Sequence, residues 1–317
     1  MPAPGRILVT GADGFVGGHL LPAFRTAFPQ ARLLAASRGE QVVPGADETL
    51  PFDLLAPAGM EPLVARSRPD VVVHLAAQSS VAASFADPLG SWRANLLGSL
   101  ALAEAVLREA PECRFILASS AEVYGLSFQS GKALDETAPL IPANPYAASK
   151  AAIDLAIGEM ALRGLRALRL RLFNHTGPGQ SEAFVVAGFA RQIARIEAGQ
   201  QAPLLRVGAL DRWRDFLDVR DVCAAYVAAL RTDLSNGAVL NIASGTPRRI
   251  GDVLEGLLKR TPLRPRVEVE TTRLRPTDVE RVVGDAARAQ ELLGWRPSID
   301  WDETLDAVMA DGRKCCL

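Results

Sequence analysis

Short apolar runs alternate with longer stretches of helical periodicity along the first half of the chain. Continuous apolar strands separated by helices are typical of a parallel sheet that is covered on both faces. The pattern therefore predicts an α/β fold with a doubly wound Rossmann sheet. The predicted strands are 6–10, 32–36, 71–75, 114–118 and 167–173. The predicted helices are 18–28, 92–109 and 147–163.

The rhythm changes after Phe173. Loops become longer and richer in Gly, Pro and Arg, and only short strands and helices separate them. We therefore expect a Rossmann domain from 1–173 plus about 215–243, in which a helix near 219–230 packs back against the sheet. A smaller mixed α/β domain, from 174–214 and 244–317, is expected to bind the substrate.

Three glycines follow the first strand and open the first helix. Gly11, Gly14 and Gly17 give a G-x-x-G-x-x-G spacing. Such glycines allow a tight turn, a close approach of backbone to a diphosphate, and close packing of helix on strand. The N–H groups at the start of the helix then favour phosphate. We expect this segment to bind a nicotinamide dinucleotide.

The end of the second strand indicates which dinucleotide is bound. Sites that prefer NAD place an acidic residue there, but this chain has Ser37 followed by Arg38. A hydroxyl and a guanidinium suit a 2′-phosphate, so we expect NADP(H) to be preferred, with NAD(H) as an alternative cofactor. A solvated surface arginine is the competing interpretation of Arg38. Asp53 and Leu54 are expected at the adenine.

Tyr146 and Lys150 are four residues apart, so on a helix they share one face. A nearby ammonium favours phenolate, and we expect Lys150 to lower the pKa of Tyr146 and make it a usable acid or base. Lys150 is also expected to bond to the nicotinamide ribose. Ser120, at the end of a predicted strand, would bond to the substrate oxygen.

Composition and charge argue against several other classes of protein. The net charge of −1 gives no electrostatic reason for nucleic-acid binding. Four scattered cysteines suggest neither a disulfide framework nor a metal site, and His74 and His175 are interpreted as structural. The N-terminal segment lacks the apolar core of a signal peptide, and no run approaches the length of a membrane span. We expect a cytoplasmic protein without membrane contact.

The motifs together resemble the extended short-chain dehydrogenases/reductases of nucleotide-sugar metabolism. The resemblance runs from Ile7 to about Pro297 and rests on GADGFVG, HLAAQSSV, ASSAEVYG, NPYAASK, FNHTGPGQ, RDFLDVRDV, LNIASG and RPTDV. It implies the following cofactor-binding residues: Gly11, Asp13, Gly14, Phe15, Val16, Gly17, Ser37, Arg38, Asp53, Leu54, Leu75, Ala76, Ala77, Tyr146, Lys150 and Phe173.

The C-terminal motifs resemble the GDP-mannose-type members of that family. Dehydratases of the family keep a general base at the position of Glu122, but Ala121 offers no group to assist loss of the carbon-6 oxygen. We therefore favour NADPH-dependent reduction of the 4-keto group of a GDP-4-keto-6-deoxy-mannose-type sugar, giving a GDP-rhamnose-type product. A GDP-mannose 4,6-dehydratase, or another nucleotide-sugar 4-epimerase or dehydratase, remains the alternative. A dinucleotide-binding sensor without catalysis is disfavoured by the intact Ser120, Tyr146 and Lys150.

The resemblance also suggests which residues bind the GDP-sugar. Arg214 and Arg275 are expected to clamp the diphosphate, although a surface salt bridge is the competing interpretation of each arginine. A homodimer is expected to form through the helices 92–109 and 147–163. The predicted substrate-binding residues are Ser79, Ser80, Asn174, Val185, Val207, Arg214 and Arg275.

Overall fold

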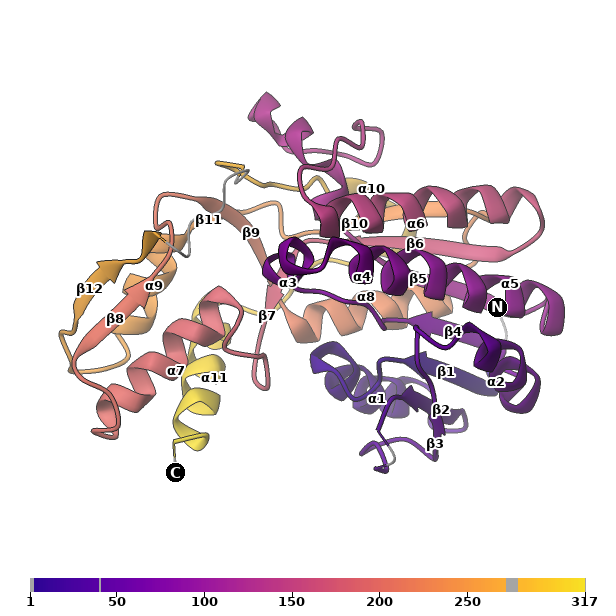
Figure 1. The fold of residues 1–317 in the computed structure, drawn as a ribbon, viewed down its shortest axis with the longest axis horizontal. Helices are drawn as coiled ribbons and strands as arrows, with labels where there is room; N and C mark the ends of the chain where they lie inside the picture. The colour runs from indigo at the N-terminus through magenta and orange to yellow at the C-terminus, as the bar shows by residue number, and fades with distance from the viewer. Residues whose placement is uncertain (1–2, 40, 272–278, 317) are drawn as a thin grey trace.

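The computed structural model describes residues 3–39, 41–271 and 279–316. Its centre is a seven-stranded sheet with all pairings parallel and the order β10-β6-β5-β4-β1-β2-β3 (Figure 1). This confirms the predicted doubly wound α/β fold. The strands are β1 (Arg6–Thr10), β2 (Arg32–Ser37), β3 (Glu48–Pro51), β4 (Val71–His74), β5 (Arg114–Ser120), β6 (Arg166–Leu172) and β10 (Ala238–Ile242).

The chain reverses its direction across the sheet after β3. It runs outward from β1 to β2 and β3, and then returns to place β4 on the other side of β1. In open α/β sheets a crevice forms at such a switch point, beyond the carboxyl ends of the strands. The topology therefore places a cleft next to the glycine turn that follows β1.

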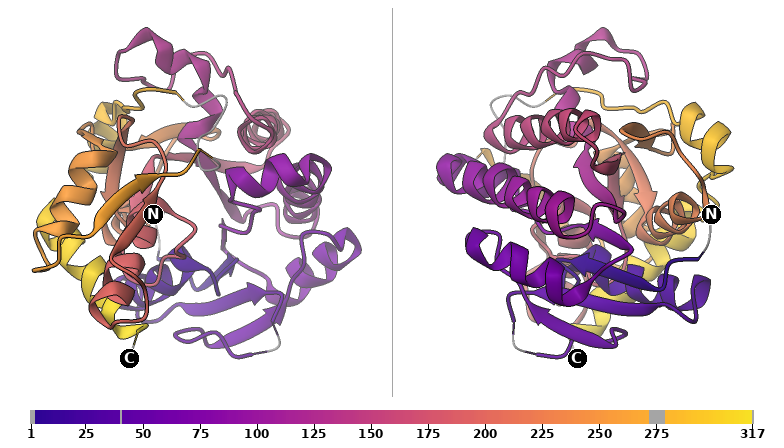
Figure 2. Two further views of the ribbon diagram at one scale, coloured as in Figure 1. Left: turned by 60° about the vertical axis from the view of Figure 1, so that its left-hand side comes forward. Right: turned by 90° about the vertical axis from the view of Figure 1, so that its right-hand side faces the viewer.

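Helices cover both faces of the sheet (Figure 2). Successive side chains of a strand point to opposite faces. Accordingly, Ile7 and Val9 pack in one core cluster with α1 and α8, whereas Leu8 packs in a second cluster with α2, α5 and α6. These helices are α1 (Phe15–Ala27), α2 (Met60–Ser67), α5 (Ser99–Glu109), α6 (Pro145–Leu162) and α8 (Val219–Arg231). The helix α8 packs against α1, as the sequence predicted.

The predicted helix 92–109 is not regular. It consists of α4 (Pro88–Trp92), a π-helical segment at Arg93–Gly98 and α5. Asn95 and Gly98 of the π segment are buried, and a Cβ on Gly98 would lie 2.3 Å from the carbonyl oxygen of Leu54. Hydrophobic periodicity cannot register a one-residue insertion that serves such a close approach. It also missed β3 and α2, which are short.

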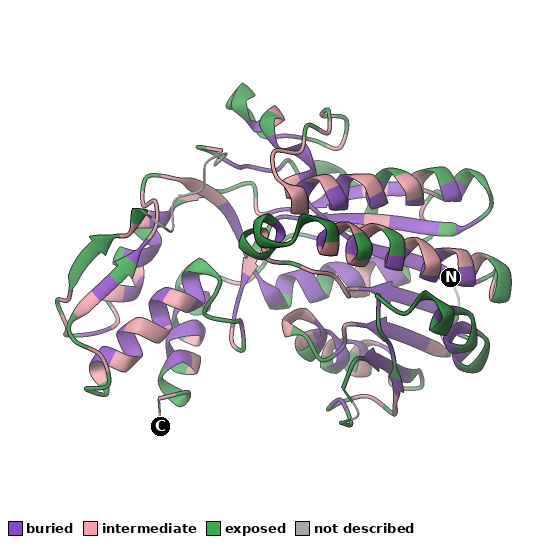
Figure 3. Ribbon diagram, in the orientation of Figure 1, coloured by how far each residue is buried: buried purple, intermediate pink, exposed green. Residues whose placement is uncertain are grey.

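Several elements of the second half of the chain form a smaller part with its own apolar core, seen on the left of Figure 1. Strand β12 on its edge is exposed along its whole length (Figure 3). Strand β9 crosses the boundary expected near residue 215. These elements are β7 (Asn174–Thr176), β8 (Leu204–Val207), β9 (Trp213–Asp218), β11 (Pro247–Arg249), β12 (Arg266–Val269), α7 (Val185–Glu197), α9 (Ile250–Leu258) and α11 (Trp301–Lys314). The helix α10 (Ala287–Leu293) instead packs against β10 and α8 of the central sheet.

None of the helices in the described ranges combines the length and apolar character that a bilayer span requires. Within the same ranges, no group of three or more His, Cys, Asp or Glu side chains is arranged to hold a metal ion.

Candidate functional site

A cavity of about 740 Å³ lies at the switch point, bounded by the carboxyl ends of β1, β4, β5 and β6 and by the start of α6. It brings together residues that are far apart in the sequence. The predicted residues that line it are Gly11, Asp13, Gly14, Phe15, Val16, Gly17, Ser37, Arg38, Asp53, Leu54, Leu75, Ala76, Ala77, Ser79, Ser120, Glu122, Tyr146, Lys150, Phe173 and Asn174.

The structure explains why glycine is needed at two of the three positions of the glycine turn. Gly11 has a φ of +69°, and a Cβ there would lie 2.9 Å from the backbone nitrogen of Ala76. A Cβ on Gly17 would lie 2.4 Å from the carbonyl oxygen of Ala12, so only glycine lets α1 pack this closely on the turn. Gly14 caps α1 without a side-chain hydrogen bond, which leaves backbone N–H groups directed at the cavity.

Ser37 and Arg38 lie at the far end of this cavity. Ser37 is buried, and its hydroxyl donates a 3.5 Å hydrogen bond to the carbonyl oxygen of Gly39. Arg38 is exposed, and no ion pair joins it to another residue in the described ranges. The Asp53 carboxylate accepts a hydrogen bond from the backbone N–H of Leu55. This corner offers a hydroxyl, a guanidinium and one carboxylate.

The histidine of the central strand is a structural residue. The Nδ1 of His74 lies 2.7 Å from the Thr10 hydroxyl and its Nε2 lies 2.8 Å from the Ser99 hydroxyl. Burial lowers the pKa of His74 to about 3, so the ring is neutral at physiological pH. It ties β4 to β1 and α5, and thereby holds the backbone at Leu75 and Ala76 against the cavity.

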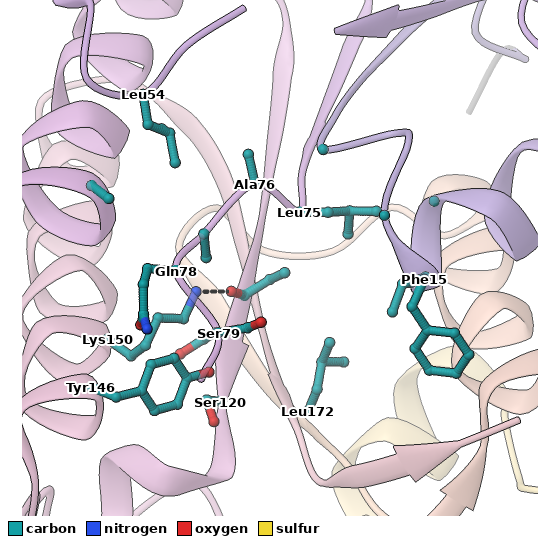
Figure 4. Close-up of a pocket in the computed structure, with 18 of the residues that line it drawn as sticks. Phe15, Leu54, Leu75, Ala76, Gln78, Ser79, Ser120, Tyr146, Lys150 and Leu172 are labelled. Atoms are coloured by element: carbon teal, nitrogen blue, oxygen red, sulfur yellow. Dashed lines mark hydrogen bonds between the residues drawn. The ribbon is translucent and has the colours of Figure 1, made fainter. Parts of the chain in front are cut away.

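Ser120, Tyr146 and Lys150 converge at one end of the cavity (Figure 4). Against the larger effect of burial, the Ser120 hydroxyl lies close enough to the Tyr146 phenol to lower its pKa. The ammonium of Lys150 donates a 2.5 Å hydrogen bond to the carbonyl oxygen of Ala118. Helix α6, which carries Tyr146 and Lys150, begins at Pro145 and is capped by Asn144, whose side chain accepts from the N–H of Ala147.

The predicted effect of Lys150 on Tyr146 is wrong. Burial raises the pKa of Tyr146 to about 12, and the negative charge of Glu122 acts in the same direction. Burial also lowers the pKa of Lys150 to about 8, although Asp154 opposes that shift. Desolvation of the buried phenol is the largest influence on its pKa. Tyr146 is therefore held as a protonated phenol, ready to donate.

Glu122 is fixed beside these residues. Its carboxylate accepts a 3.2 Å hydrogen bond from the Asn144 amide, and its backbone N–H donates to the Ser120 hydroxyl. The sequence analysis did not single out Asn144, although its position before Pro145 is a capping signal. Asn144 therefore serves both as the cap of α6 and as a partner of Glu122.

Two further residues near the cavity carried no sequence signal. The Asn95 side chain accepts from the N–H of Gln78, and it donates to the carbonyl oxygen of Gln78 and to the Ser149 hydroxyl. Ser149 in turn donates to the carbonyl oxygen of Tyr146. The π segment thereby clamps the loop after β4 to the start of α6, a contact that only the tertiary structure creates.

Some predicted substrate residues lie away from the main cavity. Ser80 caps α3 (Val81–Ala86) through a hydrogen bond from Ala83, and Val185 begins α7, where its neighbour Phe184 lines the cavity instead. Val207 is buried in the core of the smaller part, since it lies on the inner face of β8. Arg275 lies outside the described residues.

Arg214 occupies a small pocket that adjoins the main cavity. Glu122, Asn144 and Val282 also line this pocket. The guanidinium of Arg214 donates hydrogen bonds to the carbonyl oxygens of Trp213 and Val279, at 2.8 and 2.9 Å. The neighbouring carboxylate of Asp215 is buried and accepts from the backbone N–H groups of Ser244, Gly245 and Gly284.

Comparison with known proteins relates this site to enzymes of GDP-sugars. A family model described as GDP-mannose 4,6 dehydratase matches residues 8–308. GDP-6-deoxy-D-mannose reductase of Pseudomonas aeruginosa is 38% identical over 96% of this chain and 96% of that protein. GDP-mannose 4,6 dehydratase 1 of Arabidopsis thaliana is 33% identical over 77% of this chain and 68% of that protein. The structure of RMD from Pseudomonas aeruginosa complexed with NADPH has a TM-score of 0.84 and 36% identity, covering 98% of this chain and 99% of that one.

Proposed function

Because this chain belongs to the GDP-mannose 4,6-dehydratase family of extended short-chain dehydrogenases/reductases, we propose that it is an NADPH-dependent reductase. Its substrate is a GDP-4-keto-6-deoxy-mannose-type sugar, whose 4-keto group becomes a hydroxyl in a GDP-rhamnose-type product. Similarity to a GDP-6-deoxy-D-mannose reductase over nearly the whole of both chains supports this proposal.

The glycine turn fits a dinucleotide. The close approach at Gly11, the packing of Gly17 on Ala12 and the uncapped start of α1 leave a backbone cradle that larger residues would fill. When bound there, NADPH supplies the hydride. Lys150 would hold the ribose of the cofactor, and the backbone from Leu75 to Ala77 would flank its nicotinamide half.

The protonated state of Tyr146 suits reduction. Hydride addition to a ketone creates an alkoxide that needs a proton. Because the pKa of Tyr146 is raised to about 12, its phenol carries a proton at physiological pH and can donate it. Ser120, which lines the same cavity beside Tyr146, would hold the substrate oxygen in reach of that proton. Beside them, the Ala121 side chain provides no acid for expulsion of a carbon-6 hydroxyl.

Product analysis tests the proposal directly. With GDP-4-keto-6-deoxymannose, we expect NADPH to be consumed in equal amount to the substrate, measured by absorbance, and a new carbon-4 proton to appear in the NMR spectrum. A 4-epimerase would instead recycle its cofactor and consume none. Unchanged NADPH and sugar after prolonged incubation would contradict the proposed reaction.

One observation favours the alternative of a GDP-mannose 4,6-dehydratase. Glu122 is held by Asn144 next to Tyr146, where a dehydratase keeps its base. Incubation with GDP-mannose and NADP⁺ separates the two functions, because a dehydratase makes the 4-keto-6-deoxy sugar without net cofactor change. We expect no such product.

We expect NADPH to be preferred to NADH because of Ser37 and Arg38. A guanidinium–phosphate hydrogen bond contributes about 1.5–3 kcal/mol, so Arg38→Ala should lower kcat/KM for NADPH about 10- to 100-fold while leaving the value for NADH nearly unchanged. Arg32→Ala, at the opposite end of the same strand and paired with Glu48, is the matched control. Equal effects of Arg38→Ala on both cofactors would rule out contact with the 2′-phosphate.

The sugar and diphosphate are proposed to occupy the end of the cavity beyond Tyr146. Ser79 and Asn174 line that cavity, and Arg214 faces the adjoining pocket with Glu122. A guanidinium at this place suits the diphosphate of a GDP-sugar. The positions of Ser80, Val185 and Val207 give them no direct part in this arrangement.

We also propose a homodimer in the cytoplasm. The helix formed by α4, the π segment and α5 lies beside α6 on one face of the sheet (Figure 1). These helices expose Leu97, Leu155 and Leu162, the last of which is 90% exposed. Two such helix pairs would bury these side chains in a four-helix bundle. Light scattering should give twice the chain mass, and Leu155→Arg should yield a monomer, whereas Leu292→Arg on α10 should not. A monomeric parent protein would end this proposal.

A further inference from the structure

A carboxylate is buried behind the catalytic residues. Asp154 lies one helical turn beyond Lys150 on α6, and its side chain is 0% exposed. It accepts hydrogen bonds from the Ser119 hydroxyl at 2.5 Å, from Nη2 of Arg171 at 2.9 Å and from Nη1 of Arg169 at 3.2 Å. An ion buried this completely is stable only because these partners replace water.

These contacts join the elements that carry the reaction. Ser119 precedes Ser120 at the end of β5, and Arg171 lies on β6 just before Leu172 and Phe173, which line the cavity. Helix α6 carries Tyr146 and Lys150. One carboxylate therefore fixes the helix of the acid to the two strand ends that border the substrate space.

The carboxylate also opposes a set of buried positive charges. Lys150 lies one turn away on the same helix, and Arg169 and Arg171 reach Asp154 from β6. Other titratable groups near this cluster are Tyr146 on α6 with Glu122 acting on it, and His74 from β4, which is neutral. Tyr124 from the 3₁₀ helix Ala121–Tyr124 lies against Arg171, with Glu136 acting on Tyr124 and Arg288 on Arg169. Tyr124 accepts from Arg171 and stays protonated, because burial raises its pKa to about 12.

We propose that Asp154 is a positioning residue of the reaction: it locks α6 to the ends of β5 and β6, and its negative charge keeps Lys150 in the ammonium form. This inference rests on the proposed catalytic use of Lys150, but it concerns a residue that does not reach the cavity surface. Asp154 thus acts through Lys150 and Tyr146 and touches neither substrate nor cofactor.

The chain offers an unusually direct test, because it has only four lysines. With ¹³C-labelled lysine, the Lys150 signal of the protein without ligands is identified by its loss in Lys150→Met, and its titration midpoint is measured by NMR. The parent midpoint is expected near pH 8. Asp154→Asn should lower it by about 1 pH unit. Glu159→Gln, an exposed carboxylate on the same helix, should leave it unchanged.

Asp154→Asn leaves the guanidinium groups of Arg169 and Arg171 without their carboxylate, so this variant could fail to fold. A second variant keeps the proposal testable in that case. Asp154→Asn combined with Arg169→Met removes one charge of each sign, so the net charge of the cluster is kept. A smaller downward shift of the Lys150 midpoint is expected in this double variant, because loss of the Arg169 charge offsets part of the effect of losing the carboxylate. The titration needs no substrate, so its result is independent of whether the proposed reduction is correct.

Turnover gives the second readout. In the folded Asp154 variant we expect kcat to fall about 10-fold or more, with the KM for the keto-sugar within about 2-fold of the parent value. The decline of kcat at high pH should begin at a lower pH in this variant than in the parent protein. A Lys150 midpoint and a kcat that both match the parent protein would overturn the proposal.

Discussion

Replacement of Tyr146 by phenylalanine is expected to lower kcat by about 10²- to 10⁴-fold, the usual contribution of a positioned general acid. The substitution removes one hydroxyl and keeps the buried ring, so the fold should persist. NADPH binding, measured by fluorescence, should change little, because Lys150 and the glycine turn are untouched. The measurement is steady-state reduction of the keto-sugar.

The chain contains its own control for this experiment. Tyr226 on α8 is also buried, and its hydroxyl has no hydrogen-bond partner among the described residues. Tyr226→Phe should leave kcat unchanged and should not destabilise the protein, since an unpaired hydroxyl is lost from the core. If Tyr146→Phe retained a kcat within about 3-fold of the parent, Tyr146 would not be the proton donor.

Replacement of Lys150 by methionine is expected to abolish most activity and to stabilise the protein. The pKa of Lys150 is lowered to about 8, so the unfolded chain binds more protons than the folded chain between about pH 8 and the ordinary lysine value. The free energy of unfolding therefore rises with pH through that window. Below pH 8 the charged lysine destabilises the fold by an amount on the order of 3 kcal/mol.

Thermal unfolding at pH 7 and turnover together check this prediction. Lys150→Met should raise Tm by several degrees while kcat/KM falls about 10²-fold or more. Lys150→Arg keeps a positive charge and is the matched control: it should retain more activity and should not gain stability. A lower Tm for Lys150→Met would show that the ammonium stabilises the fold, contrary to its burial.

The same shift predicts the pH dependence of reduction. Tyr146 stays protonated throughout the physiological range, so the acid itself sets no limit there. Lys150 loses its proton as pH rises through about 8, and its hold on the ribose weakens with the charge. We expect kcat/KM for NADPH to be level below this value and to decline above it, with the decline absent in Lys150→Arg.

The sequence predicted the sheet and most of the candidate site because these features depend on residues that are close together in the sequence. Continuous apolar runs specify buried parallel strands, the positive φ of Gly11 favours glycine locally, and Gly17 is required by its contact with Ala12 within the turn. Tyr146 and Lys150 share a face because four residues make about one helical turn. The family then supplied the class of reaction, which a Y-x-x-x-K pair alone does not name.

The tertiary structure decided everything that depends on partners distant in the sequence. Asn95 meets Ser149 across 54 residues, and Ser119 meets Asp154 across 35. The tertiary structure also places Val207 in the core of the smaller part and brings the Asn144 amide within hydrogen-bond distance of the Glu122 carboxylate. It also reversed the expected titration of Tyr146, because the pKa of a phenol beside an ammonium depends on how far both groups are removed from water, and only the folded chain determines that burial.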